Sequence, residues 1–196
     1  MSESTWHTVA NVAIIVCWGA FALVWIIGAV YNARRSPAVR TRTMGRLQLL
    51  IAGAVAWAVL LLVPDSDWER LTIDAGWIRW LGLVLLVAST VFIIRARFSL
   101  GLMWSSDVIA REDHQLRTDG PYGMVRHPIY TGLLGMLLGS ALLDGPGRWT
   151  IGLVLGGVIV LLKVRAEERL MGKVFPGEYE RYRRRVPALV PHPWRH

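Results

Sequence analysis

Long apolar blocks alternate along the chain with short polar segments. The five blocks cover residues 9–31, 45–63, 77–94, 129–143 and 149–164. A helix needs about 20 apolar residues to cross ~30 Å of hydrocarbon, and the first three blocks reach that length. Because unpaired backbone polar groups are too costly in lipid, each block is predicted to be helical. The pattern predicts an all-α integral membrane protein with five transmembrane helices.

The last two blocks are joined by Asp144-Gly145-Pro146-Gly147-Arg148, a run rich in residues that break helices. We therefore predict a helical hairpin, with the fifth helix continuing past Val164 into water. Small residues at a spacing of three or four let helices approach closely. The glycines of the fourth block are predicted to meet those of the fifth. They are Gly132, Gly135 and Gly139 in the fourth block, and Gly152, Gly156 and Gly157 in the fifth.

The charges of the connecting loops indicate the orientation of the chain. The segment before the first block carries Glu3 and neither Lys nor Arg, whereas the loop after it carries five arginines. The next loop is acidic, and the loop and tail that follow are basic. Basic loops stay in the cytoplasm, so we expect the N-terminus outside and the C-terminus inside. An aromatic belt is predicted at the outer boundary, formed by Trp6, Trp68, Trp77, Trp80 and Trp149.

Composition supports a single membrane domain over residues 1–196, with 54% hydrophobic residues and a mean hydropathy of +0.40. The net charge of +8 is interpreted as contact of basic loops with anionic lipid headgroups, and no nucleic-acid motif is found. The single cysteine, Cys17, excludes an internal disulfide and a Cys-based zinc site, and is expected to be buried. No obligate protein partner is evident.

Candidate chemistry gathers in two predicted cytoplasmic segments, residues 114–130 and 165–182, which bracket the hairpin. Because a hairpin turns back on itself, its two cytoplasmic ends must lie side by side. The two segments are therefore predicted to build one site.

The first segment places Arg126 and His127 directly before Pro128, which is suited to begin a helix. Free N–H groups and the positive end of the helix dipole favour an anion there. Alternatively, both side chains mark the membrane boundary and reach toward headgroups. The second segment places Glu167 and Glu168 beside Arg165, where acids near the bilayer need partners.

Arg165 and Arg169 share a helix face and are candidates to pair with a glutamate, although a solvated, salt-bridged helix end is an alternative. An anion site next to a cation site suits a zwitterionic amino-acid group, such as that of S-adenosylmethionine. Tyr122 and Tyr130 are suited to cover its adenine. No glycine-rich loop follows a strand, so a Rossmann cofactor domain is not expected.

The segment Gly120-Pro121-Tyr122, followed by residues 125–132 (Val-Arg-His-Pro-Ile-Tyr-Thr-Gly), resembles the signature of the isoprenylcysteine carboxyl methyltransferase family. The later residues Glu167, Glu168, Phe175, Tyr179, Tyr182, Val186, Pro187 and Pro191 are similar to its C-terminal pattern. The resemblance covers about residues 100–191. Pro176 stands where a glycine is expected, and Gly177 follows it directly.

This resemblance implies S-adenosylmethionine as cofactor, with S-adenosylhomocysteine as product, held between the first segment and the final helix. Its implied contacts are Gln115, Leu116, Gly120, Tyr122, Val125, Arg126, His127, Pro128 and Tyr130. Glu167 and Glu168 would bind the amino end, and which of them makes the main contact is open. Residues 96–196 form the implied catalytic half, and residues 1–95 a three-helix half that shapes the substrate pocket.

Methyl transfer requires the enzyme to hold two reactants about 3–3.5 Å apart and to exclude water. We expect a lipophilic acceptor, because the protein lies in the membrane. We expect its acceptor group to be an isoprenylcysteine-like or other lipid-like carboxylate, because a carboxylate needs no general base. The predicted catalytic residues are Arg126, Arg165 and Arg169, as candidates to grip that carboxylate, together with Glu168. An amine or thiol acceptor would need His127 or a glutamate as base. No metal is required.

Two other functions are alternatives. A NADPH-dependent membrane reductase of a sterol or isoprenoid typically has Asn where this chain has Ile129, and would need more basic residues for the cofactor's phosphates. A non-catalytic membrane scaffold leaves the two polar clusters at one hairpin unexplained. The acceptor atom and the oligomeric state are left open by the sequence.

Overall fold

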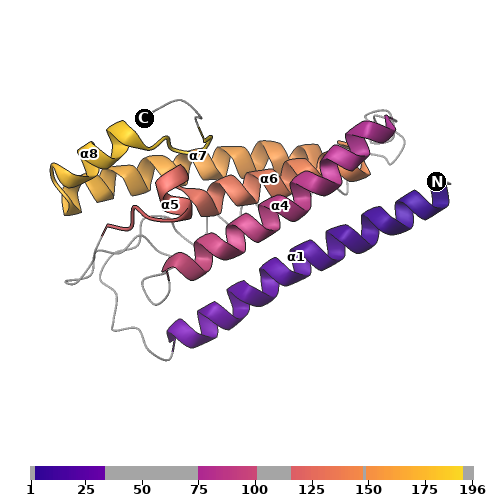
Figure 1. Cartoon of the computed structure of the whole chain (residues 1–196), viewed down its shortest axis with the longest axis horizontal. Coiled ribbons are helices and arrows are strands. Elements are labelled where there is room, and N and C mark those ends of the chain that lie inside the picture. Colours follow the sequence, from indigo (N-terminus) through magenta and orange to yellow (C-terminus); the bar gives the residue numbers. More distant parts are fainter. Residues whose placement is uncertain (1–2, 34–74, 101–115, 148, 192–196) are drawn as a thin grey trace.

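The computed structural model describes residues 3–33, 75–100, 116–147 and 149–191, and every regular element in these ranges is a helix (Figure 1). The elements are α1 (Glu3–Ala33), α4 (Gly76–Leu100), α5 (Pro121–Met124), α6 (Pro128–Asp144), α7 (Trp149–Val174) and α8 (Glu178–Arg185). The second predicted block, residues 45–63, lies outside the described ranges. The all-helical class is confirmed, and the count of five membrane helices stays a prediction.

Among the described residues, three helices are long and apolar enough to cross a membrane: Ser4–Tyr31, Gly76–Leu100 and Trp149–Val174. The apolar helix α6 is shorter. Large apolar side chains remain exposed along α1 and α4, including Ile15, Leu23 and Val84. Apolar surface of this extent is unusual next to water and suits contact with lipid. The fold is therefore that expected for a membrane protein.

The predicted break between the last two blocks is confirmed. Helix α6 ends at Asp144, and Gly145 follows with a φ of 100°, a conformation that favours glycine. The Trp149 indole Nε1 donates a hydrogen bond to Asp144 Oδ2 at 3.2 Å, which ties the start of α7 to the end of α6. Helix α7 then continues past Val164 to Val174, as predicted.

The glycines of α6 pack against α4. A Cβ added to Gly132 would lie 2.6 Å from Ile93 Cβ, and one added to Gly139 would lie 2.6 Å from the Leu86 nitrogen. Gly82 of α4 makes the reciprocal approach, 2.5 Å from the Leu143 nitrogen. Backbones that come this close form the tightest helix contact in the described bundle.

The predicted pairing of these glycines with those of α7 is therefore wrong. Gly152 and Gly156 face the side chain of Leu137, and nothing lies within 4 Å of a Cβ added to Gly157. Residues at a spacing of three or four form a single helix face, and one face can serve only one neighbouring helix at such short range. In this fold α4 occupies it.

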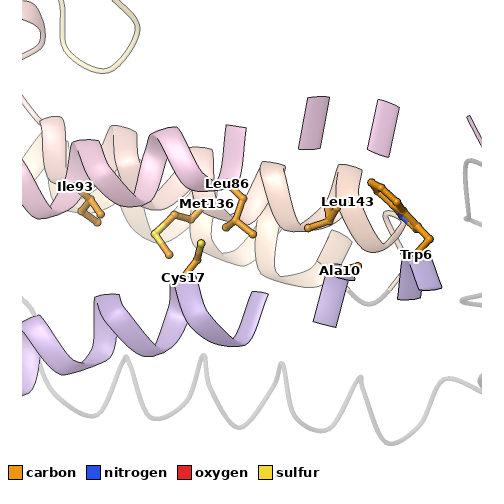
Figure 2. Close-up of a cluster of buried hydrophobic side chains, with 7 residues drawn as sticks. All are labelled: Trp6, Ala10, Cys17, Leu86, Ile93, Met136 and Leu143. Atoms are coloured by element: carbon orange, nitrogen blue, oxygen red, sulfur yellow. The ribbon is translucent and has the colours of Figure 1, made fainter. Parts of the chain in front are cut away.

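A buried apolar cluster joins α1, α4 and α6. Its members are Trp6, Ala10 and Cys17 from α1, Leu86 and Ile93 from α4, and Met136 and Leu143 from α6 (Figure 2). Cys17 is 7% exposed, which confirms its predicted burial. The Trp18 indole also donates to Ser140 Oγ at 3.1 Å, linking α1 to α6.

The two ends of the bundle differ in character. The start of α1, the start of α4 and the α6–α7 turn lie at one end (Figure 1). Trp6 of α1 and Trp80 of α4 lie there with ring centroids 5.1 Å apart. Trp149, at the start of α7, stacks at 6.1 Å on Trp18, which comes from the middle of α1. Trp68 lies outside the described residues. The other end carries α5, α8, the start of α6 and the end of α7, and with them most of the candidate chemistry.

Candidate functional site

The two polar segments meet through Arg126 and Glu168. Arg126 Nε donates a hydrogen bond to Glu168 Oε1 at 3.1 Å, and its Nη2 pairs with the same oxygen. The side chains are only 8% and 16% exposed. This contact confirms the prediction that segments at opposite ends of the hairpin sequence form one cluster.

His127 lies between both glutamates. Its Nδ1 is 3.3 Å from Glu167 Oε2, and its Nε2 is 3.5 Å from Glu168 Oε1. The hydroxyl of Tyr130, one turn along α6, donates to Glu167 Oε1. The rings of His127 and Tyr130 stack with centroids 5.9 Å apart, so Tyr130 covers one face of the imidazole.

The pKa of His127 is raised above its ordinary value of 6.5 by this arrangement. Burial alone lowers the pKa, because it disfavours the charged imidazolium. Hydrogen bonds and charge attraction from Glu167 and Glu168 act in the opposite direction and outweigh burial. The cluster therefore favours a protonated His127 facing two carboxylates.

The chain after α8 closes over the start of α6. The backbone nitrogens of Arg126 and His127 donate to the carbonyls of Pro187 and Ala188 at 2.8 and 3.0 Å. Thr131 Oγ1 donates to the Leu189 carbonyl at 2.6 Å. Sequence reasoning assigned no role to Thr131 or to these carbonyls. The available signals were the position of Thr131 within residues 125–132 and the Val186-Pro187 pair, both part of the family resemblance.

Glu168, an acid of the protein itself, pairs with the side chain of Arg126 just before α6. The Arg126 guanidinium also donates to the carbonyls of Arg183, at 3.2 Å, and Val186. The predicted anion and cation poles thus partly neutralise each other. This arrangement favours a positioning role for Arg126 over one in gripping an acceptor. Glu167, which is 24% exposed, is the more accessible of the two acids.

The turn before α6 is built around Gly120 and Tyr122. Gly120 has a φ of 56°, which favours glycine, and Pro121 begins α5. Tyr122 is buried, and its carbonyl accepts a hydrogen bond from the hydroxyl of Tyr182 at 2.6 Å. The pKa of Tyr122 is raised mainly because burial disfavours its phenolate.

Helix α8 places Tyr182 against this turn. Gly177, with a φ of 78°, precedes α8 and donates its N–H to Glu180 Oε2 at 2.6 Å. This bond is the backbone half of a capping box, and it ties the N-cap of α8 to the third residue of the helix. Tyr179 and Tyr182 are 4% and 7% exposed, and burial raises the pKa of Tyr179 to about 12.

The remaining predicted residues take varied places. Val125 and Pro128 are fully buried beside His127, and Leu116 is half-buried. Gln115 lies outside the described residues. Arg165 and Arg169 are exposed on α7, where Arg169 Nε donates to the Arg165 carbonyl at 3.2 Å. Among the residues that the structure describes, the arginines that pair with Glu168 are Arg126 and, at 3.8 Å, Arg183, which the sequence did not indicate.

Comparison with known proteins places this geometry in a family. The phospholipid methyltransferase family model matches residues 77–178. Protein-S-isoprenylcysteine O-methyltransferase B of Arabidopsis thaliana is 29% identical over 154 residues, covering 73% of this chain and 76% of the relative. A nickel-cobalt-cadmium resistance protein of Alcaligenes xylosoxydans xylosoxydans is 30% identical over 142 residues, covering 68% of this chain and 58% of the relative.

The fold is similar to the solved structure of the eukaryotic intramembrane Ras methyltransferase ICMT (isoprenylcysteine carboxyl methyltransferase). The TM-score is 0.61 at 19% sequence identity, covering 91% of this chain and 67% of that chain. At this identity the likeness concerns the fold. The chain spans little more than half the length of the metal-resistance relative. Because the family match covers more than half of the 196 residues and includes Arg126, His127 and both glutamates, the chain belongs to the phospholipid methyltransferase family.

Proposed function

We propose that this protein is a membrane methyltransferase that moves a methyl group from S-adenosylmethionine to the carboxylate of a lipophilic acceptor. The observation that carries the proposal is the buried cluster in which Arg126, His127 and Tyr130 meet Glu167 and Glu168. It lies inside the part of the chain that matches the family. That match favours methyl transfer over the reductase and scaffold alternatives.

The residues of the cluster fit the amino-acid end of such a cofactor. Glu167 is the more exposed acid, and its partners are the Tyr130 hydroxyl and the shared His127. A carboxylate accepts several hydrogen bonds, so Glu167 can take an ammonium as well. The first N–H groups of α6, at Ile129 and Tyr130, have no carbonyl one turn earlier in the helix and suit a carboxylate. When bound, the cofactor supplies an electrophilic methyl group on a sulfonium.

The protein's own contribution is to position the reactants. The Arg126–Glu168 pair holds the start of α6 against α7, and the tail fastens it from the other side. Tyr122 and Tyr130 offer rings to cover an adenine. An acceptor carboxylate is already ionised, so holding it about 3–3.5 Å from the methyl carbon and excluding water would suffice.

The location of the site suits an acceptor that arrives from the bilayer. The cluster lies at the end of the bundle opposite the N-terminus (Figure 1). With the orientation indicated by loop charge, this end faces the cytoplasm and the helices span the cell membrane. The acceptor's apolar chain would lie among the helices while the cofactor enters from water.

Binding measurements on the full chain in detergent test the proposal. We expect calorimetry to show saturable binding of S-adenosylhomocysteine and none of NADPH. Radiolabelled S-adenosylmethionine should transfer its methyl group to N-acetyl-S-farnesylcysteine. Binding of NADPH alone would instead establish a reductase, and binding of neither would favour the scaffold.

The role of Glu167 has its own test. Glu167→Gln should weaken S-adenosylhomocysteine binding by about tenfold or more, because the ammonium loses a charged partner. Glu178→Gln is the matched control, since Glu178 is exposed in the first turn of α8. Equal affinity in both variants would remove Glu167 from the proposed site.

A further inference from the structure

Lys163 is the first charged residue along α7. The residues from Trp149 to Leu162 contain no Asp, Glu, Lys or Arg, and at about 1.5 Å per residue they cover about 21 Å of helix. Helix α7 is a candidate membrane span, and the hydrocarbon core of a bilayer is ~30 Å thick. A helix that enters the membrane at Trp149 therefore still has Lys163 inside the hydrocarbon. Ionisable residues at such depth are rare and costly, and they usually serve a function.

The charge of Lys163 is not used by the fold. No hydrogen bond or ion pair joins this half-buried side chain to any residue that the structure describes. Glu167 lies four residues further along α7, but its carboxylate accepts from the Tyr130 hydroxyl and faces His127. A lysine that precedes a glutamate at this spacing is also the weaker orientation for an ion pair. The ammonium of Lys163 is therefore left for a ligand.

Contacts on either side fix the level of Lys163 in the helical hairpin. Toward the site, Glu167 meets the Tyr130 hydroxyl. Away from the site, a Cβ added to Gly156 would lie 2.8 Å from Leu137 Cδ1. Lys163 lies between these two levels, one helical turn or about 6 Å along the axis from Glu167. It thus belongs to the membrane side of the proposed cofactor site.

Lys163 also stands where the lipid-facing side of α7 gives way to the buried side. Its neighbour Leu162 is 48% exposed, and its other neighbour, Val164, is 7% exposed. Arg165 and Arg169 lie about 160° and 120° away from Lys163 around the helix axis, and both are exposed. A ligand that moves from the bilayer toward the cofactor would therefore meet Lys163 and neither of these arginines.

We propose that Lys163 binds the carboxylate of the lipophilic acceptor, one helical turn from the acid that takes the ammonium of the cofactor. This inference rests on the proposed methyltransferase function and assigns its acceptor site. The lysine ammonium has three N–H donors, and its attraction for a carboxylate is stronger away from water. When a carboxylate oxygen bonds to the methyl carbon and the sulfonium–methyl bond breaks, the acceptor becomes an uncharged ester. Lys163 would thus favour the acceptor over the product.

One substitution and two acceptor ligands test the charge. Lys163→Met removes it and keeps an unbranched, apolar side chain that suits a membrane span. KM for N-acetyl-S-farnesylcysteine should rise by about tenfold or more. Ki for its uncharged carboxamide, a competitive inhibitor, and Kd for S-adenosylhomocysteine should stay unchanged. Lys173→Met is the matched control, because Lys173 is exposed in the last turn of the same helix, and it should alter none of the three values.

A second variant keeps the charge and changes the group that bears it. Lys163→Arg should retain a preference for the carboxylate over the carboxamide. If this variant binds the carboxamide like wild type but has lost the preference, a positive charge at this position does not bind the acceptor, and the inference is overturned.

Three results for Lys163→Met would also overturn it. Weaker binding of S-adenosylhomocysteine with an unchanged KM for the acceptor would place Lys163 on the carboxylate of the cofactor. Unchanged values for all three ligands would leave lipid headgroups as its partner. Equal losses for the carboxylate and the carboxamide would show a structural role.

Failure of the proposed function has a different signature. Wild-type protein would then neither bind S-adenosylhomocysteine nor transfer a methyl group. Calorimetric binding of N-acetyl-S-farnesylcysteine and its carboxamide to wild type and Lys163→Met still decides on Lys163. A preference for the carboxylate that disappears in the variant supports the anion site, and equal affinities in wild type overturn it.

Discussion

Arg126 and Glu168 are 42 residues apart in the sequence, yet they form an ion pair with side chains only 8% and 16% exposed. The pair ties the first residues of α6 to the last turns of α7. His127 follows Arg126 and contacts the same glutamate, so the ion pair also fixes where the imidazole lies. The geometry of the whole cluster depends on this contact.

Loss of Glu168 is therefore expected to destabilise the protein. Glu168→Gln leaves the buried Arg126 guanidinium without its counter-charge, and breaking a buried pair costs about 3–5 kcal/mol, less where one partner is partly exposed. Thermal unfolding in detergent should show a lower midpoint than that of wild type. Glu178→Gln, at an exposed site, should leave the midpoint unchanged. Equal midpoints for the two variants would show that the pair contributes nothing to stability.

The raised pKa of His127 predicts a pH dependence of stability. Because the folded pKa lies above the ordinary value of 6.5, the stabilisation is complete below about pH 6.5. It is lost as the pH rises through the folded pKa. The difference in melting midpoint between wild type and His127→Asn should thus be largest in acid and shrink in base. A difference that grows with pH would mean that His127 is neutral in the folded protein.

For that comparison, the exposed His7 of α1 provides a control. The difference in melting midpoint between wild type and His7→Asn should not shrink with rising pH in the way expected for His127→Asn.

The close contact of α4 and α6 predicts opposite effects for two glycine substitutions. A methyl group at Gly139 would lie 2.6 and 2.8 Å from the backbone of Leu86, which cannot move aside, so Gly139→Ala should cost about 1–3 kcal/mol. Gly157→Ala meets nothing within 4 Å and should be neutral, or stabilising by up to about 1 kcal/mol, since alanine favours helix. Melting midpoints of the two variants check this. If Gly157→Ala lowers the midpoint more than Gly139→Ala does, the glycine face of α6 does not pack against α4.

The hydrogen bond from Tyr182 to the Tyr122 carbonyl predicts a coupling between α8 and the turn at α5. Tyr182→Phe leaves a buried carbonyl without its donor, at a cost of about 1–3 kcal/mol. Because Tyr122 belongs to the proposed cofactor site, affinity for S-adenosylhomocysteine should fall several-fold. Calorimetry measures this, with Tyr31→Phe at an exposed position of α1 as control. Unchanged affinity would show that the bond does not support the site.

Local features of the sequence determined the helices and their ends. Apolar length set α1 and α4, and Pro128, Gly145 and Gly177 mark boundaries because their backbone preferences act on neighbouring residues alone. The contact between the two polar segments also followed from sequence, since a helical hairpin with a short connecting turn leaves its two open ends adjacent. For the same reason Arg126, His127 and the paired glutamates were predictable as one cluster.

Only the tertiary structure decided which side chains of these helices meet. The sequence does not specify the rotation of each helix about its axis, and that rotation turned the glycines of α6 toward α4 and left Arg165 and Arg169 exposed. It also aimed Glu168 at Arg126 and placed Arg97 against Gly28. Such contacts join residues far apart in the chain, and their energies depend on several elements packing at once, so no local pattern records them.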